Sequence, residues 1–183
     1  VGPRTWEMLA RLESGRLATL FRKHRGSFAP EGSAPEKIVR AALSRWSPHH
    51  DQTGSNAGEA LAPFLTDWPE GTPWCALFAS WAVHTALGDY GPLRQRQAAA
   101  KAIRAAGIRS NAWVDWTDVE RHEPGVVVGG VFVMNRGGAQ SDHATASWQG
   151  HTGIVLARVG TLVYTVEGNI NDMVRGHVRE LST

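Results

Sequence analysis

The chain has 183 residues, of which 42% are hydrophobic, and a formal net charge of +2 at neutral pH. This length and composition allow a buried core without crosslinks, and they predict one domain with a short additional segment. The weak positive charge does not indicate a nucleic-acid-binding protein. No apolar run reaches the roughly 20 residues that a membrane-spanning helix needs, so we expect no membrane insertion. Because the sequence begins with Val1 rather than Met, we expect it to be part of a longer protein.

The first 32 residues are predicted to be a separate segment that ends in a linker. Residues 3–12 carry apolar side chains at helical spacing, after a proline suited to a first helical turn. The residues before position 33 are rich in Gly, Ser and Pro, which is typical of a linker. We therefore divide the chain into residues 1–32 and residues 33–183.

Helices are predicted in the first half of the second segment. Ser33 and Glu36 have the spacing of a capping box at the start of a helix. A short helix is expected near residues 61–68, and an alanine-rich helix over residues 91–108.

A further helix between these two is predicted to be central. Thr72 is expected to cap it, with Pro73 at its first position and Gly88 at its end. This helix is apolar on nearly all sides, which predicts that it is buried.

The second half of the chain changes to the pattern of strands. β-branched or alternating stretches separated by turn residues cover residues 125–135, 150–159, 161–169 and 173–181. Helices followed by strands indicate an α+β fold, in which the N-terminal helices pack on a small antiparallel sheet.

Cys75, the only cysteine of the chain, lies in the first turn of the predicted central helix. Free backbone N–H groups and the helix dipole stabilise a thiolate at this position, and lower the pKa of a thiol below its usual value of about 8.5. A free cysteine in an apolar helix is also commonly a small core residue. The helix alone leaves both interpretations open, so a neighbouring base must decide between them.

Candidates for that base and its partners lie on the predicted strands. His151 opens one strand in "GHTGIV", between glycines that allow close approach of another chain segment. The next strand ends in "VEGN", and the two-residue period places Glu167 and Asn169 on one face. Antiparallel pairing can bring this carboxylate beside His151, although a histidine at a strand start is commonly structural. We predict a site of four residues, Cys75, His151, Glu167 and Asn169.

A metal site is not expected. His49, His50 and Asp51 form a polar cluster, but adjacent residues of an extended segment point apart and no third ligand follows at a recognisable spacing. A calcium-binding loop pattern is also absent from the sequence. We interpret residues 47–60 as a surface loop, and we expect neither a metal nor another cofactor.

The segments "GTPWCALFASW", "GHTGIV" and "VEGN", in this order, resemble the CHAP family of cysteine, histidine-dependent amidohydrolases/peptidases from bacterial and phage cell-wall enzymes. The resemblance runs from about Ser33 to near the C-terminus, and includes "GSNAGEAL". It implies a papain-like α+β fold with Cys75 as the nucleophile and His151 as the base. It also implies that Glu167 orients the imidazole and that Asn169 is an additional polar member of the site.

The N-terminal stretch "VGPRTWEML" resembles the last helix of a small peptidoglycan-binding domain. Both resemblances imply an enzyme that cleaves an amide bond of the cell-wall peptide, as an N-acetylmuramoyl-L-alanine amidase or an endopeptidase. Such an enzyme is an endolysin or an autolysin; it acts at the bacterial wall after secretion or phage lysis, and we expect a monomer. The alternative is a non-catalytic wall-binding module with a decayed site, which the four competent residues disfavour.

Three other side chains are candidates for contacts with the substrate. Trp74 precedes the cysteine and Trp148 precedes the histidine strand, so each can line a groove or belong to the core. His143 lies in a polar loop that we expect at the rim of this groove.

Overall fold

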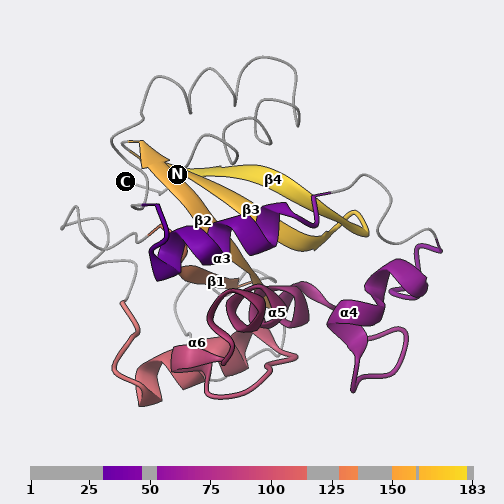
Figure 1. Ribbon diagram of the computed structural model, residues 1–183. Coiled ribbons are helices and arrows are strands. Elements are labelled where there is room, and N and C mark those ends of the chain that lie inside the picture. The colour runs from indigo at the N-terminus through magenta and orange to yellow at the C-terminus, as the bar shows by residue number, and fades with distance from the viewer. Residues whose placement is uncertain (1–30, 47–52, 115–127, 136–149, 160, 181–183) are drawn as a thin grey trace.

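The computed structural model describes residues 31–46, 53–114, 128–135, 150–159 and 161–180. In these residues, helices precede strands along the chain, and the strands form one antiparallel sheet with the order β1-β2-β3-β4 (Figure 1). The predicted α+β class and the antiparallel meander are therefore confirmed. The helix expected at residues 3–12 lies outside the described residues. Within the described residues, no helix combines the length and apolar character needed to cross a bilayer.

In the described part of the chain, the helical elements lie between residues 34 and 109. They are α3 (Ala34–Leu43), η2 (Glu59–Leu61), α4 (Ala62–Leu65), α5 (Cys75–Leu87), η3 (Gly91–Leu93) and α6 (Ala100–Arg109). Ser33 is the N-cap of α3, and its hydroxyl accepts a hydrogen bond from the Glu36 backbone N–H at 3.4 Å. This contact confirms the predicted cap.

The start of α5 differs from the prediction. The helix begins at Cys75, and Trp74 is its N-cap residue with φ −108° and ψ 11°. Thr72 does not cap the helix, because its hydroxyl donates to the Pro69 carbonyl at 2.7 Å. The helix ends at Gly88 as predicted, with φ 80°. Cys75 is consequently the first helical residue, at the positive end of the helix dipole.

The predicted helix over residues 91–108 is shorter in the structure. A single 3-10 turn covers Gly91–Leu93, and α6 begins only at Ala100. Arg94 has a left-handed φ of 63°, which interrupts the helix. The backbone N–H of Gln97 then donates to the Ser80 hydroxyl on α5 at 3.0 Å, so this segment is tied to α5.

The four strands are β1 (Val131–Asn135), β2 (Gly150–Val159), β3 (Leu162–Ile170) and β4 (Met173–Glu180). β2, β3 and β4 agree with the predicted strands to within one residue at each end. The pairing of β2 with β3 shifts between Val155 and Ala157, and that of β3 with β4 shifts between Glu167 and Ile170. An extra residue in β3 at the second shift locally breaks the alternation of side chains.

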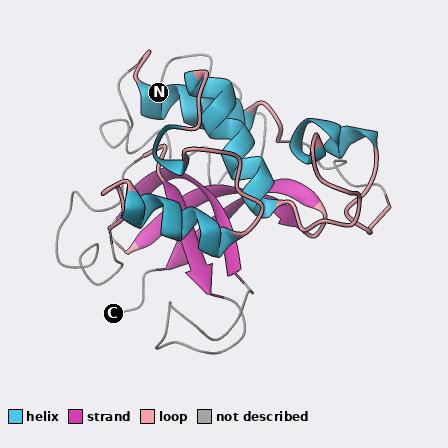
Figure 2. Ribbon diagram, turned by 90° about the horizontal axis from the view of Figure 1, so that it is seen from below, coloured by secondary structure: helices cyan, strands magenta, loops and turns pink. Residues whose placement is uncertain are grey.

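The core lies between the helices and one face of the sheet (Figures 1 and 2). α5 packs against β2 and β3, and α3 packs against α5 and β2. Ile154 and Val166 are register partners on this face, and both are completely buried. Strand alternation therefore places their sequence neighbours on the other face, which carries the polar side chains described next.

Candidate active site

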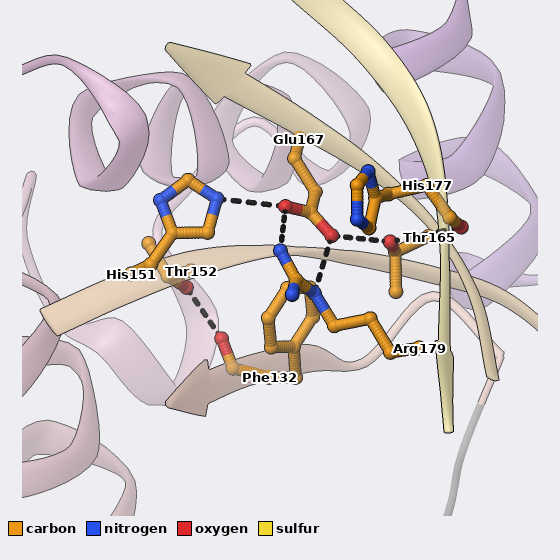
Figure 3. Close-up of polar contacts among 7 residues, drawn as sticks. All are labelled: Phe132, His151, Thr152, Thr165, Glu167, His177 and Arg179. Atoms are coloured by element: carbon orange, nitrogen blue, oxygen red, sulfur yellow. Dashed lines mark hydrogen bonds and ion pairs between the residues drawn. The ribbon is translucent and has the colours of Figure 1, made fainter. Parts of the chain in front are cut away.

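His151 and Glu167 form a buried pair across β2 and β3. Nε2 of His151 lies 2.7 Å from Oε2 of Glu167 (Figure 3). The two side chains are only 1% and 0% exposed. The structure thus brings the predicted base and the predicted acidic group into direct contact, out of water.

A glycine in β2 makes room for this contact. Continuing the register that pairs Ile154 with Val166 places Gly153 opposite Glu167, and His151 diagonal to it. A Cβ atom on Gly153 would lie 2.7 Å from Cγ of Glu167. The missing side chain therefore lets Glu167 lie over β2 and reach His151, as the glycines beside the histidine predicted.

Two further side chains hold the Glu167 carboxylate. Arg179 of β4 donates from Nε to Oε1 at 2.8 Å and from Nη2 to Oε2 at 2.5 Å. Thr165 donates from its hydroxyl to Oε1. The guanidinium of Arg179 also lies over the ring of Phe132 in β1, with 5.5 Å between Cζ and the ring centroid. Sequence analysis did not identify Arg179 or Thr165 as parts of the site.

These contacts keep Glu167 ionised. Burial by itself raises the pKa of this carboxyl, but the hydrogen bonds from His151, Arg179 and Thr165 outweigh it. Together with the charge of Arg179, they lower the pKa of Glu167 from its ordinary value of 4.5 to about 2. Glu167 is consequently an anion that accepts hydrogen bonds at any pH near neutrality.

Cys75 lies at the N-terminal end of α5, with 8% of its surface exposed. The neighbouring helix residues contact β3 directly: a Cβ atom on Gly168 would be 2.8 Å from Trp74 and 2.6 Å from Phe78. Gly168 follows Glu167 in sequence. The helical turn that carries the thiol therefore packs on the same stretch of β3 that carries the carboxylate.

Asn169 does not follow the two-residue period that predicted its place. It has a left-handed φ of 61° and lies within the irregularity between Glu167 and Ile170. Among the described residues, no hydrogen bond joins its side chain to His151 or Glu167. The contribution of Asn169 to the site stays a prediction.

Trp74 belongs to the core in this structure. Its side chain is 0% exposed and stacks on Phe64, with 5.5 Å between the ring centroids and 8° between the ring planes. Of the two interpretations of Trp74, groove wall or core residue, the structure supports the core, since an enclosed indole offers no surface to a substrate.

The remaining expected features lie outside the described residues. These are Trp148, His143 and the cluster of His49, His50 and Asp51. In the part of the chain that the structure describes, no group of three or more His, Cys, Asp or Glu side chains is placed to hold a metal ion.

Comparison with protein families identifies the family of the chain. The model of the CHAP domain matches residues 67–169, which is more than half of the chain. The matched part contains α5 with Cys75, the start of β2 with His151, and β3 with Glu167. No curated protein and no solved structure matches the chain. The chain therefore belongs to the CHAP domain family, a group of amidase- and peptidase-type hydrolases with a papain-like α+β fold.

Proposed function

We propose that this protein is a cysteine-dependent peptidoglycan hydrolase, with Cys75 as the nucleophile and His151 as the general base. The observation that carries the proposal is the buried contact between Nε2 of His151 and the ionised carboxylate of Glu167. This contact uses one ring nitrogen and leaves Nδ1 for a thiol. A thiol, an imidazole and a group that orients the imidazole are the components that activate a cysteine nucleophile.

Cys75 and His151 lie at the ends of their elements, where we propose that the two side chains come into contact. Cys75 is the first residue of α5, and His151 is the second residue of β2. Continuing the register of β2 and β3 places Gly168, which lies against α5, opposite Thr152. The N-terminal end of α5 therefore lies near the end of the sheet at which β2 begins. The proposed contact forms beside the packed core, at the ends of both elements.

The mechanism follows from this arrangement. Nε2–H of His151 donates to Glu167, so Nδ1 carries the lone pair that accepts the thiol proton of Cys75. The thiolate attacks the carbonyl carbon of the substrate amide and forms a tetrahedral oxyanion. The backbone N–H of Cys75, in the first turn of α5, is placed to donate to this oxyanion.

The same imidazole completes the reaction. Nδ1–H of His151 gives its proton to the amide nitrogen, the C–N bond breaks, and the amine leaves. Glu167 stabilises the intermediate imidazolium through the 2.7 Å contact. A water molecule then transfers a proton to His151 and attacks the thioester, which releases the acid and restores the thiol.

The proposed substrate is the peptide part of peptidoglycan, as membership of the CHAP family implies. The amide between the sugar and L-alanine and the amides within or between peptide stems are all secondary amides, so one mechanism serves an amidase and an endopeptidase. We propose that the enzyme acts at the bacterial cell wall, after export or after release on lysis, as a monomer. An ionised carboxylate held by His151, Arg179 and Thr165 argues against a decayed site.

Hydrolysis of purified sacculi by the full chain tests the proposal. We expect Cys75→Ala and His151→Ala to abolish hydrolysis, and Cys75→Ala to keep a thermal unfolding temperature and a binding to sacculi close to those of the native protein. His151→Ala should lower the unfolding temperature, because it removes a buried side chain that donates to Glu167. His84→Ala is the matched control, because His84 is an exposed histidine of α5 that stacks on Tyr90, and it should leave the rate unchanged. Hydrolysis that survives in Cys75→Ala, or that EDTA abolishes, would reject the thiol mechanism.

The same digests identify the bond that is cleaved. Mass spectrometry of the soluble fragments distinguishes a free L-alanine amine, which an amidase releases, from new ends within the peptide, which an endopeptidase releases. Fragments cleaved only between sugars would contradict amide hydrolysis.

A further inference from the structure

We propose that Arg179 is a positioning residue of the active site, which fixes the carboxylate of Glu167 and, through it, the orientation and the protonated nitrogen of His151. The inference rests on the proposed function. Arg179 lies on β4, beyond residues 67–169 that match the CHAP domain. The assignment therefore comes from the contacts of this chain.

Hydrogen bonds from neighbouring side chains fix the carboxylate of Glu167 (Figure 3). Arg179 forms a two-pronged contact, with Nε 2.8 Å from Oε1 and Nη2 2.5 Å from Oε2. Thr165 adds a third donor on Oε1, and His151 adds a fourth on Oε2. A carboxylate offers about four lone-pair positions, so these four donors occupy its accepting capacity. The planar guanidinium also fixes the plane of the carboxylate, which a point charge does not do.

The charge of Glu167 determines which nitrogen of the His151 imidazole carries the hydrogen. An ionised carboxylate only accepts hydrogen bonds, so the nitrogen that faces it, Nε2 of His151, must carry the hydrogen. The neutral ring then has its lone pair on Nδ1, which is the form that the proposed mechanism requires. A protonated Glu167 could instead donate to Nε2 and place the hydrogen on Nδ1. Arg179 disfavours this second arrangement because it stabilises the carboxylate anion.

Arg179 reaches the carboxylate from a distant position on β4. Its register partner is Val163, four residues before Glu167, so the side chain must extend along β3 to reach the carboxylate. The guanidinium of Arg179 packs over the ring of Phe132 in β1. The side chain is 25% exposed. A bidentate ion pair that is partly enclosed stabilises the carboxylate anion more than an exposed pair does, because solvent screens it less.

Other charged or titratable groups near Glu167 provide a control. From β2, His151 contacts it and Arg158, the register partner of Val163, lies on the same face; from β4 the neighbours on this face are Arg175, His177 and Arg179. Arg175 is the register partner of Glu167, but its Nη2 contacts the sulfur of Met173 at 3.2 Å, and its side chain is exposed. Arg175→Met thus removes the same charge from the same strand without touching the carboxylate.

The test measures kcat and KM of Arg179→Met and Arg175→Met for hydrolysis of a soluble peptidoglycan fragment, between pH 5 and pH 8. For Arg179→Met we expect kcat to fall about tenfold to a hundredfold, because the imidazole of His151 is then held less accurately for the reaction. KM should change little, and the loss should be larger at pH 5 than at pH 8, because a less stabilised Glu167 takes up a proton there. Arg175→Met should keep the native pH profile. Equal losses in both variants, or a loss of the same size at every pH, would overturn the proposal.

A spectroscopic measurement is independent of turnover. Nitrogen NMR of histidine-labelled protein at pH 8 should show the hydrogen of neutral His151 on Nε2 in the native chain. Arg179→Met should shift the ring toward the Nδ1–H form or a mixture as the pH is lowered. Should Arg179→Met fail to fold, Arg179→Gln keeps a donor without the charge and carries the same expectation. An unchanged tautomer in the folded variant would contradict the inference even if Cys75→Ala abolishes hydrolysis; persistent hydrolysis in Cys75→Ala would reject the proposed function instead.

Discussion

Gly168 of β3 lies directly against Trp74, the residue that precedes Cys75. A Cβ atom on Gly168 would be 2.8 Å from Cζ3 of Trp74 and 2.6 Å from Cβ of Phe78. These separations are shorter than van der Waals contact, so only a residue without a side chain lets β3 approach α5 this closely. The contact sets the distance between the turn that carries the thiol and the strand that carries Glu167.

Gly168→Ala should therefore impair catalysis as well as stability. The added methyl group must push β3 and the first turn of α5 apart, which costs about 1–3 kcal/mol of the free energy of unfolding. A displacement of the thiol by a fraction of an ångström should lower kcat at least tenfold, since catalysis depends on placing the reacting atoms accurately. Urea unfolding and sacculus hydrolysis per folded molecule measure the two effects.

Gly176→Ala is the control for this substitution. A Cβ atom on Gly176 of β4 would meet the ring of Trp46, which follows α3 in the sequence. This variant should lose stability but keep its kcat, because the crowded contact does not involve α5. Full activity in Gly168→Ala would show that the contact with Trp74 does not position the site.

Glu167→Gln tests the charge of the carboxylate with little change in shape. The amide cannot accept four hydrogen bonds and leaves the guanidinium of Arg179 without its anion. We expect kcat to fall at least a hundredfold, because the amide neither stabilises the imidazolium nor fixes the tautomer of His151. Loss of one partner of the ion pair should also cost up to about 3 kcal/mol of stability. Glu180→Gln, on the exposed end of β4, is the matched control and should change neither quantity.

The stability of the protein should depend on pH through Glu167. The pKa of this carboxyl is about 2 in the folded protein and ordinarily 4.5, so the folded state binds its proton less readily than the unfolded state. Its contribution to stability is complete above pH 4.5 and is lost as the pH falls toward 2. The difference between these pKa values corresponds to about 3 kcal/mol.

Urea unfolding at pH 7, pH 4 and pH 2.5 measures this contribution. The difference in unfolding free energy between the native protein and Glu167→Gln should shrink as the pH is lowered. A difference that stays constant over this range would contradict the assigned pKa of Glu167.

The contact between His151 and Glu167 was predictable because it depends on local rules. Strand alternation and a short connection between two antiparallel strands bring the start of "GHTGIV" beside the end of "VEGN". The predicted helix cap at Ser33 was also correct, because a hydroxyl that caps a helix acts within one turn. These features require no knowledge of how distant elements pack.

The role of Arg179 and the burial of Trp74 could not be predicted in the same way. Arg175 and Arg179 alternate onto one face of β4. The register pairs Arg175 with Glu167, but the side chain of Arg179, whose register partner is Val163, is the one that reaches the carboxylate. The extra residue of β3 between Glu167 and Ile170 shifts that register, and composition does not reveal it. Trp74 is buried because Phe64 stacks on it and Gly168 lies against it, which are contacts between distant segments.

Alkylation of the thiol tests the central claim most directly, because the chain contains a single cysteine. The full chain is treated with iodoacetamide at neutral pH, and intact-protein mass spectrometry and sacculus hydrolysis are followed on the same samples. We predict that one carbamidomethyl group is added, that hydrolysis is lost in proportion to its addition, and that His151→Ala is alkylated more slowly. Protein that is fully alkylated on Cys75 and still hydrolyses sacculi would contradict the thiol mechanism.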